Sequence, residues 1–480
     1  MNLKQLTTDI CAQYSANDPD IIRITDRLDE VGDGTLFVCV NGRHTDGHKL
    51  AAQAIKRGAA AVVCERDLGL REQMIVADSR EAMAHIAAAF YGYPARQLPL
   101  IGVTGTNGKT TVSCWIRAIL EKTGKKTALI GTLGADSGDG FENTDYTTPD
   151  SVVFNRKLFE AVQKKCKAAV AEISSQALHQ HRCDGLPFSV GVFTNVSREH
   201  LDYHGTLQAY AQQKAKLFQR ADAAVLNADD EAFALMKSNS KGKICTYSLK
   251  DESDLTAKNI VHHENGVSYI LVSRDGIARM QVKTPGIFSV YNSMAAVGAC
   301  LALGLDFETV TSAASDLPQV PGRMQSVLTD APFRVFVDYA HTPDALQQVL
   351  QALRKTTSGK LTVVFGCGGD RDATKRPRMG EISSLLADVT VLTNDNPRSE
   401  DPLQIIQQIA NGFCGQTDLQ ICPDRREAIT YALQNANAGD CVLIAGKGHE
   451  KVQCTADGCV AFDDVQSVVE IWNKMQNKKA

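Results

Sequence analysis

The 480-residue sequence has no apolar run of membrane-spanning length and no excess of positive charge. A membrane-spanning helix needs about 20 consecutive apolar residues. The formal net charge is −4, so electrostatics give no reason to expect binding to nucleic acid or to an anionic membrane. The first residues also lack the apolar core of a signal peptide. We therefore expect a soluble cytoplasmic monomer with no nucleic-acid partner and no membrane partner.

Cysteine is not scarce, but paired spacings of the CxxC type are absent, and no internal repeat or low-complexity tract occurs. The 14 cysteines are scattered from Cys11 to Cys459. This distribution indicates reduced thiols in a cytoplasm rather than a disulfide framework or a zinc site. The length predicts about three domains, and a composition of 44% hydrophobic and 22% charged residues is typical of a soluble globular protein.

The stretch Leu100–Thr111 joins an apolar run, a glycine-bearing turn and the start of an amphipathic helix. Gly105 and Gly108 let backbone N–H groups face a polyphosphate, and the helix N-terminus adds positive partial charge. Lys109 can reach the outer phosphates, and the Thr110 hydroxyl can bind Mg²⁺. The strict pattern GxxxxGK[ST] fails by one position, since a valine stands where the first glycine is expected. The alternative is a turn between a strand and a helix that binds no ligand. We interpret the stretch as an ATP site.

Helix-like and strand-like segments alternate through most of the chain, which is typical of parallel sheets covered by helices on both faces. We predict an α/β fold with domains at residues 1–97, 98–322 and 323–480. From 254 to 284 the pattern changes to alternating strands, which predicts an antiparallel flap on the middle sheet. Other predicted strands are 36–40, 60–64, 74–77, 126–131, 168–173, 189–195, 223–227, 333–339, 361–365, 389–393 and 441–445.

Polar residues gather where the predicted strands of the middle domain end. In doubly wound sheets these ends form one crevice, which the phosphate loop also faces. Glu172 and His200 are therefore candidate Mg²⁺ ligands, although a capping glutamate and a loop histidine explain the same residues equally well. Further polar residues at these ends are Thr147, Thr148, Ser174, Gln180 and Arg182.

Lys214 falls on the apolar stripe of a predicted helix. Leu207, Tyr210 and Leu217 share that stripe, whereas Lys216 points elsewhere. An inward lysine needs an anion or a modified amine, since an unpaired buried ammonium is costly. The alternative, which the sequence alone favours, is a side chain that extends to solvent.

Four predicted strands of the last domain each end in a polar loop. Loops on one edge of a parallel sheet indicate a second binding site. These loops lie at residues 338–344, 366–372, 395–398 and 446–450. A polar loop at 42–48 also follows a strand of the first domain, where a solvated turn is at least as good an explanation.

Taken together, these blocks resemble the Mur ligase family, the ATP-dependent amide-forming enzymes of peptidoglycan precursor synthesis. The resemblance covers nearly the whole chain, and the blocks occur in the family's order. The loop 395–398 (DNPR) is similar to that of the members that add diaminopimelate. The other matching blocks are 105–111, 147–149 (TTP), 172–175, 193–205 (FTNVSREHLDYHG), 210–218, 320–324, 338–344 (DYAHTPD) and 366–379 (GCGGDRDATKRPRM).

The resemblance implies a three-domain Mur ligase architecture with a central P-loop ATPase-type sheet and a Rossmann-like C-terminal domain. It implies a ligase that uses ATP and Mg²⁺ to add meso-2,6-diaminopimelate to UDP-N-acetylmuramoyl-L-alanyl-D-glutamate through an acyl phosphate. An L-lysine-adding ligase and a ligase like folylpolyglutamate synthase remain alternatives. A nucleotide-dependent switch or motor is the alternative from outside the ligases.

The resemblance also implies roles for individual residues. Lys214 would be carbamylated and would hold Mg²⁺ together with Thr110, Glu172 and His200. The catalytic residues would be Lys109, Glu172, His200 and Lys214. ATP would contact Gly105, Thr106, Asn107, Gly108, Lys109, Thr110, Thr111, Asn292, Arg323 and Asp338. The UDP substrate would contact Arg43, His44, Thr45, Thr147, Thr148, Ser174, Gln180 and Arg182. Diaminopimelate would contact Arg371, Asp395, Asn396, Pro397, Arg398, Gly446 and Glu450.

One segment departs from the family's pattern. The family usually carries Asp-Ser-Arg before its first strand, and Arg27-Leu28-Asp29 stands there in this chain. Leu28 has no hydroxyl to offer a uridine. A two-residue insertion would instead pair Arg27 with the family's arginine, so the contacts to uracil stay open.

Overall fold

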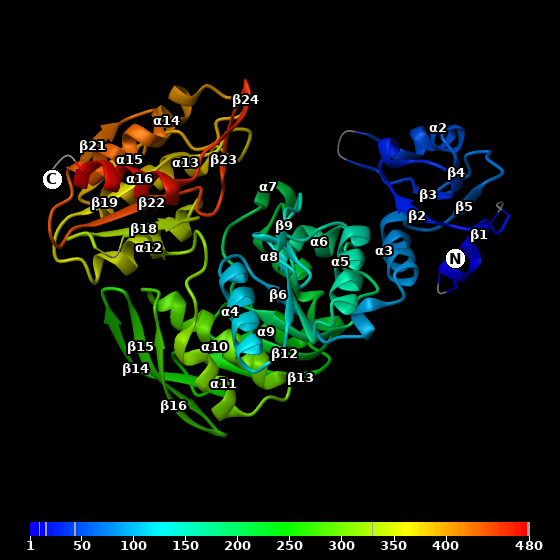
Figure 1. Cartoon of the computed structure of the whole chain (residues 1–480), viewed down its shortest axis with the longest axis horizontal. Coiled ribbons are helices and arrows are strands. Elements are labelled where there is room, and N and C mark those ends of the chain that lie inside the picture. Colours follow the sequence, from blue (N-terminus) through cyan, green and yellow to red (C-terminus); the bar gives the residue numbers. More distant parts are fainter. Residues whose placement is uncertain (9, 15–16, 43–44, 329, 416, 478–480) are drawn as a thin grey trace.

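The computed structural model describes residues 1–8, 10–14, 17–42, 45–328, 330–415 and 417–477. The chain forms three domains, and the N-terminal and C-terminal domains lie on two sides of the middle one (Figure 1). Each domain is built around its own sheet. Within the described ranges, none of the helices combines the length and the apolar character needed to cross a membrane. Arg43 and His44, two of the predicted substrate contacts, lie outside the described residues.

The N-terminal domain has a sheet in the order β1-β5-β4-β3-β2, parallel except for β1 at the edge. Apolar side chains of α3 pack on one face and those of α2 on the other. Asp78 caps α3 by accepting hydrogen bonds from two backbone N–H groups. The elements are α1 (Leu3–Leu6), β1 (Gln13–Tyr14), β2 (Arg23–Thr25), β3 (Thr35–Val38), α2 (Ala51–Lys56), β4 (Ala59–Cys64), β5 (Gln73–Ile75) and α3 (Ser79–Phe90).

The middle sheet has the order β16-β15-β14-β13-β12-β11-β6-β10-β7-β8-β9. Strands from β14 to β7 in this order run parallel, and antiparallel strands extend both edges. The strands are β6 (Leu100–Thr104), β7 (Thr127–Gly131), β8 (Gly134–Asp136), β9 (Phe141–Glu142), β10 (Ala168–Glu172), β11 (Phe188–Phe193), β12 (Ala221–Asn227), β13 (Lys243–Ser248), β14 (Leu255–His263), β15 (Gly266–Ser273) and β16 (Gly276–Val282).

Helices cover both faces of the middle sheet because its central strands are apolar on both sides. Ile101 and Val103 of β6 pack with α4, α10 and α11, whereas Leu100 packs with α5, α6, α8 and α9. The helices are α4 (Lys109–Lys122), α5 (Ser151–Gln163), α6 (Ser175–His179), α7 (Leu201–His204), α8 (Leu207–Ala215), α9 (Phe233–Asn239), α10 (Ile287–Ala302) and α11 (Phe307–Ala313). The carboxyl ends of β6, β10 and β11 therefore meet at one edge, beside the start of α4.

The C-terminal domain has the order β17-β18-β22-β19-β20-β21, parallel except for β17. Helices α12, α13 and α14 cover one face and α15 and α16 the other. The elements are β17 (Gln325–Ser326), β18 (Arg334–Asp338), α12 (Pro343–Arg354), β19 (Leu361–Phe365), α13 (Lys375–Leu386), β20 (Val389–Leu392), α14 (Pro402–Ala410), β21 (Asp418–Ile421), α15 (Arg425–Gln434), β22 (Cys441–Ala445), β23 (Val452–Thr455), β24 (Gly458–Ala461) and α16 (Asp464–Asn477).

The α/β class and the antiparallel flap at residues 254–284 are confirmed, and every predicted strand is present within a few residues. The proposed boundaries at 97 and 322 stay predictions. The expectation that all cysteines are reduced is wrong for one pair, because Cys454 and Cys459 form a disulfide across the hairpin of β23 and β24. A spacing of five residues carries no disulfide signal by itself, and only the hairpin register brings the two sulfurs together.

Candidate active site

Two glycines shape the loop between β6 and α4. Gly108 has φ +87°, and a Cβ there would lie 2.5 Å from Oδ1 of Asn292. A Cβ at Gly105 would collide with the Thr194 hydroxyl. Only glycine fits these positions, because neighbouring side chains fill the space that a Cβ would occupy. The loop therefore presents bare backbone at the N-terminus of α4, where anions bind favourably.

The Lys109 side chain folds back over this loop. Its Nζ donates to the carbonyl oxygens of Gly105 at 2.9 Å and Thr106 at 2.8 Å. Burial lowers the pKa of Lys109, while the carboxylates of Glu199 and Glu172 oppose the lowering. Phosphate oxygens would be stronger acceptors than these two neutral carbonyls.

Glu172 lies buried at the end of β10, next to the first turn of α4. Its carboxylate accepts hydrogen bonds from the Thr110 hydroxyl at 2.9 Å, from the Thr132 hydroxyl at 3.0 Å and from the Thr132 N–H at 2.8 Å. Arg323 donates through Nη2 to the Thr110 hydroxyl at 3.1 Å. The structure thus places the predicted Thr110 and Glu172 oxygens side by side, with a cation next to them.

Lys214 is only 1% exposed, so the inward orientation is correct and the extension to solvent is not. Its Nζ donates to the Gly105 carbonyl at 2.7 Å and lies 4.3 Å from the centre of the Tyr210 ring. The pKa of Lys214 lies well below its ordinary value because the side chain is buried and the Lys109 ammonium is close. Two lysines therefore converge on one carbonyl oxygen.

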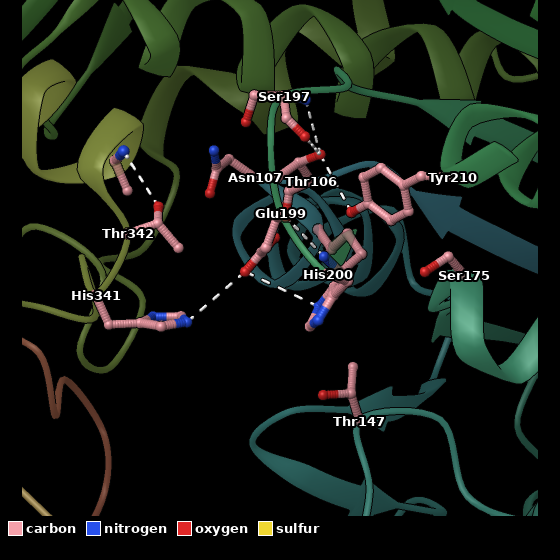
Figure 2. A network of polar contacts seen from close by, with 12 residues as sticks. Thr106, Asn107, Thr147, Ser175, Ser197, Glu199, His200, Tyr210, His341 and Thr342 are labelled. Carbon is pink, nitrogen blue, oxygen red and sulfur yellow. Dashed lines mark hydrogen bonds and ion pairs between the residues drawn. The ribbon is translucent and has the colours of Figure 1, made fainter. Parts of the chain in front are cut away.

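Figure 2 shows Glu199 between two histidines that come from different domains. Its Oε1 lies 3.7 Å from Nε2 of His341, in the loop before α12, and 3.9 Å from Nε2 of His200, before α7. Nδ1 of His341 lies 2.8 Å from the Tyr339 carbonyl, so this nitrogen carries the proton and Nε2 faces Glu199.

The charges around Glu199 favour its ionised form. Burial acts to raise the pKa of Glu199, but the positive charges that His341, His200 and two nearby lysines carry when protonated outweigh it and hold this pKa below its ordinary value. The pKa of His341 is lowered by burial and by the Lys375 ammonium. The structure therefore presents a carboxylate beside a neutral imidazole. The sequence analysis did not single out Glu199, although it lies within the conspicuous block at 193–205.

A pocket of about 110 Å³ lies between α10 and α12, beside the phosphate loop. It is lined by three of the residues predicted to contact ATP, Asn292, Arg323 and Asp338. Asp338 accepts hydrogen bonds from two backbone N–H groups at 2.6 and 2.8 Å, and burial raises the pKa of its carboxyl. The Arg323 guanidinium lies 4.5 Å from the centre of the Tyr339 ring.

A second pocket, of about 350 Å³, opens where the C-terminal loops face the middle domain. The Arg398 guanidinium donates to the Gly369 carbonyl at 2.7 Å, and Arg371 donates to the Asp370 carbonyl. Neither arginine forms an ion pair with any residue in the part of the chain that the structure describes. The predicted residues that line the pocket are Arg371, Asp395, Asn396, Arg398, Gly446 and Glu450, whereas Pro397 is buried beside it.

Acidic groups complete this pocket. Asn396 donates through Nδ2 to Glu450 at 2.8 Å and accepts from Lys447 at 3.1 Å. Gly446 has φ +109°, and a side chain there would collide with the Asp395 carboxylate. Burial raises the pKa of Asp395. Free guanidinium groups and carboxylates in one pocket suit a ligand that carries both ammonium and carboxylate groups.

A cavity of about 1120 Å³ lies between the N-terminal and middle domains. Thr45, Gln180 and Arg182 of the predicted substrate contacts line it. Arg182 donates to the Gln180 side chain at 2.7 Å and to the Thr148 carbonyl at 2.8 Å, and it lies 4.4 Å from the centre of the Tyr146 ring.

Three other predicted substrate contacts lie between this cavity and the phosphate loop. Thr147 lines the phosphate-loop pocket and pairs with the Thr132 hydroxyl at 3.1 Å. Thr148 is buried and donates to the Glu172 carbonyl at 2.7 Å, and Ser174 caps α6. Cavity-lining residues that the sequence analysis did not predict include Asp26, Arg80, Tyr146 and Tyr203. Arg27 also lines the cavity, whereas Leu28 packs against an apolar cluster.

Comparison of the chain with known proteins identifies one family. Three family models match the chain: "Mur ligase family, catalytic domain" over residues 29–91, "Mur ligase middle domain" over 103–300 and "Mur ligase, glutamate ligase domain" over 322–448. The chain is 43% identical over 462 residues to the UDP-N-acetylmuramoyl-L-alanyl-D-glutamate--2,6-diaminopimelate ligase of Geobacillus kaustophilus, with 94% of each chain covered. It is 42% identical to the ligase of the same name from Bacillus velezensis, over 99% of this chain and 100% of that one.

A solved structure of a ligase with the same name superposes with a TM-score of 0.70 and 35% identity, and covers 95% of both chains. The chain therefore belongs to the Mur ligase family. It is an ATP-dependent ligase that forms an amide bond.

Proposed function

We propose that this ligase joins meso-2,6-diaminopimelate to UDP-N-acetylmuramoyl-L-alanyl-D-glutamate in the synthesis of the peptidoglycan precursor. The identity of 43% to a relative that carries this name supports the proposal. The observation that carries it is the position of His341, which lines the nucleotide pocket, the phosphate-loop pocket and the pocket of the C-terminal loops. Groups of the nucleotide and of the incoming amino acid can therefore meet at this residue. We propose a cytoplasmic location, because ATP is a substrate.

Each pocket suits one ligand. The phosphate loop and the pocket lined by Asn292 and Asp338 would hold ATP. The large cavity between the N-terminal and middle domains would hold the UDP-linked substrate, with its free carboxylate directed toward Lys109. The pocket around Arg398 would hold diaminopimelate. This assignment would bring the γ-phosphate and the incoming amine into adjoining pockets, which share Glu199 and His341.

The chemistry then has two steps. The substrate carboxylate attacks the γ-phosphate of ATP and forms an acyl phosphate, while Lys109 compensates the negative charge that builds up on the phosphate. The amine of diaminopimelate attacks the acyl carbon, and the tetrahedral intermediate collapses with release of phosphate. Closure of the C-terminal domain on the middle domain would keep water away from the acyl phosphate.

The residues around Glu172 fit Mg²⁺, which prefers oxygen ligands. Thr110 and Glu172 supply adjacent oxygens, and His200 lines the same pocket. Among the described residues, no three acidic, histidine or cysteine side chains form a metal site by themselves. A carbamate on Lys214 would add the missing anion. When bound, the cation would supply positive charge to the phosphates.

Carbamylation of Lys214 also resolves a charge conflict. The Lys109 and Lys214 side chains donate to the same Gly105 carbonyl. The neutral Lys214 amine, favoured by its lowered pKa, would attack carbon dioxide and release a proton. The product is an anion beside the Lys109 ammonium, where an unpaired cation would otherwise be buried.

His341 is suited to accept a proton from the incoming amine. Its Nε2 carries no proton while Nδ1 donates to the Tyr339 carbonyl, and the Glu199 carboxylate 3.7 Å away would stabilise the imidazolium that forms. The ammonium of the amino acid must lose a proton before its nitrogen can attack. This pair therefore connects the middle and C-terminal domains and serves the second step.

His341→Gln is expected to lower kcat by about 100-fold, the usual contribution of a positioned proton acceptor. Because the pKa of His341 is lowered, the parent enzyme should lose activity only as the pH falls below about 6.5, where the imidazole becomes protonated. With bicarbonate added to maintain the proposed carbamate on Lys214, the variant should lack this acid limb. Profiles of kcat from pH 5.5 to 8.5 with saturating substrates test this, and an identical acid limb in both proteins would exclude the role.

The function is tested by measuring phosphate release and the new amide product with ATP, UDP-N-acetylmuramoyl-L-alanyl-D-glutamate and meso-diaminopimelate. Release that needs all three ligands, with one product per phosphate, supports the proposal. A switch or motor would hydrolyse ATP without the amino acid. A ligase like folylpolyglutamate synthase would need a folate in place of the UDP substrate.

Arg398 is expected to select diaminopimelate over L-lysine. Diaminopimelate has a second carboxylate at its far end, which a free guanidinium can bind with paired hydrogen bonds. Lysine would leave that guanidinium without a carboxylate partner, so we expect a preference of at least about 100-fold in kcat/KM. Arg398→Ala should remove most of the preference and leave the KM for ATP unchanged. Both amino acids competing in one assay give the ratio directly.

The matched control is Arg378→Ala in the same domain. The guanidinium that it removes pairs with Glu381 at the surface. This variant should keep the full preference for diaminopimelate. Equal use of lysine and diaminopimelate by the unmodified enzyme would show that Arg398 does not read the second carboxylate.

A further inference from the structure

The hairpin of β23 and β24 carries the chain's one disulfide. Cys454 and Cys459 stand directly opposite each other in its ladder, and their sulfurs are bonded. All 14 cysteines lie in described residues, and the other twelve are free thiols. In Figure 1 the hairpin appears in red at the edge of the C-terminal domain. One disulfide, with Cys459 exposed and Cys454 half-buried, in a chain of otherwise free thiols calls for a reason.

The hairpin is hydrogen-bonded to the loop that forms the amino-acid pocket. The Cys454 N–H donates to Oδ1 of Asn396 at 3.0 Å, and the Arg398 N–H donates to the Cys454 carbonyl at 3.1 Å. Gln453 donates through Nε2 to the Asp395 carbonyl at 2.8 Å. Both backbone groups of Cys454 are thus bonded to residues 396 and 398, which line the pocket.

Side-chain packing adds little to the backbone ladder and the disulfide of this hairpin. All four residues of β24 are exposed, and Val460 is 60% exposed. A two-stranded ribbon with no packed face is marginally stable in water. A covalent link across the strands removes open conformations and keeps the Cys454 backbone in the place where it meets the loop. Without the link, the hairpin can open and the loop loses these hydrogen bonds.

We propose that Cys454 and Cys459 form a reversible redox site that sets the affinity of the neighbouring pocket for its amino acid. The disulfide form holds the loop 395–398 in its binding conformation, and the dithiol form releases it. The identity of the amino acid in this inference rests on the proposed function, whereas the change in the loop does not. Disulfides in reducing compartments are mostly transient and redox-sensing, which agrees with a switch rather than a permanent link.

The co-reactant is a low-molecular-weight disulfide. The exposed Cys459 thiolate attacks one of its sulfurs, forms a mixed disulfide and releases one thiol. The Cys454 thiolate then attacks the Cys459 sulfur and releases the second thiol. Two electrons pass from the protein dithiol to the small disulfide, and the reverse exchange with thiols restores the dithiol. The exposed position of the hairpin gives such molecules access.

The test equilibrates the full-length enzyme in buffers of oxidised or reduced glutathione and measures KM for meso-diaminopimelate and for ATP. Alkylation and peptide mass analysis report the state of the pair. The KM for diaminopimelate should be roughly 5- to 10-fold higher in the reduced form, as expected when a binding loop loses preorganisation. The KM for ATP should not change. Hydrogen exchange of the peptides that contain residues 394–400 should be faster in the reduced form.

Two variants complete the design. The double variant Cys454→Ser, Cys459→Ser should behave like the reduced enzyme in both buffers, and Cys414→Ser, an exposed thiol elsewhere in the domain, should respond like the parent. Free thiols at both positions in the oxidising buffer would overturn the proposal, as would equal exchange of residues 394–400 in the two states. Absence of diaminopimelate-dependent activity in both states would overturn the proposed function instead, while hydrogen exchange would still decide the switch.

Discussion

Lys214→Ala is expected to lower kcat at least about 1,000-fold, because it removes the proposed carbamate from the centre of the site. The lowered pKa of Lys214 keeps its amine neutral near pH 7, which is the form that takes up carbon dioxide. As the pH falls through this lowered pKa, the amine becomes protonated and the carbamate is lost. The parent enzyme should therefore lose activity in acid without carbon dioxide and regain it when bicarbonate is added near pH 8.

The matched control is Lys216→Ala, two residues further on at the end of α8 and half-buried, which should leave kcat within about 2-fold of the parent. Nuclear magnetic resonance with carbon-13 bicarbonate should show a carbamate signal in the parent that is absent from Lys214→Ala. An unmodified Lys214 in a fully active enzyme would contradict the proposed modification. Analysis must avoid acid, because carbamates decompose there.

Lys109→Ala is expected to lower kcat by about 100- to 1,000-fold, the loss measured when one preorganised donor to a charged transition state is removed. The reason is that, among the residues that the structure describes, Lys109 donates to just two carbonyl oxygens and stands at the turn that would hold the γ-phosphate. The KM of the amino acid should change little, since Arg398 and Lys109 line different pockets. Steady-state kinetics with each substrate varied in turn measure both quantities.

Lys125→Ala, an exposed lysine just after the same helix, is the matched control and should retain full turnover. The melting temperature of Lys109→Ala should stay close to that of the parent, because a buried cation without a carboxylate partner adds little to stability. Near-normal turnover by Lys109→Ala would remove the assignment of ATP to this loop.

The parts of the site that follow parallel strands could be predicted from the sequence. Glu172 ends β10 and Thr110 lies in the first turn of the helix that follows β6, and pairing of these two strands brings them together. The same rule placed Arg398 and Glu450 in one pocket, since they follow strands of a second parallel sheet. Apolar strand runs bounded by polar loops carry this information locally.

Other parts depend on contacts that no local pattern encodes. Lys214 lies on an apolar stripe, but the stripe allows both a buried and a solvent-directed side chain, and only the packing of α8 decides between them. The role of Glu199 depends on its contact with His341, which lies in a loop of another domain. Strands of two or three residues, such as β8 and β9, are too short for a periodic signal.

The amino-acid pocket also combines a feature that the local sequence predicts with one that depends on contacts in space. The DNPR loop at 395–398 indicated a binding loop, whereas the hairpin that supports it gave no signal. Cys454 meets Asn396 because β23 lies against the loop in space. The spacing between Cys454 and Cys459 is set by a turn whose register cannot be derived from composition.

The central claim is that the carboxylate of the UDP substrate attacks ATP and then leaves its oxygen on phosphate. Substrate labelled with oxygen-18 in that carboxylate, incubated with ATP and meso-diaminopimelate, tests it by mass analysis of the released phosphate. One labelled oxygen per phosphate, in step with formation of the amide, is the result that the account predicts. Unlabelled phosphate accompanying the amide would contradict an acyl phosphate and, with it, the proposed mechanism.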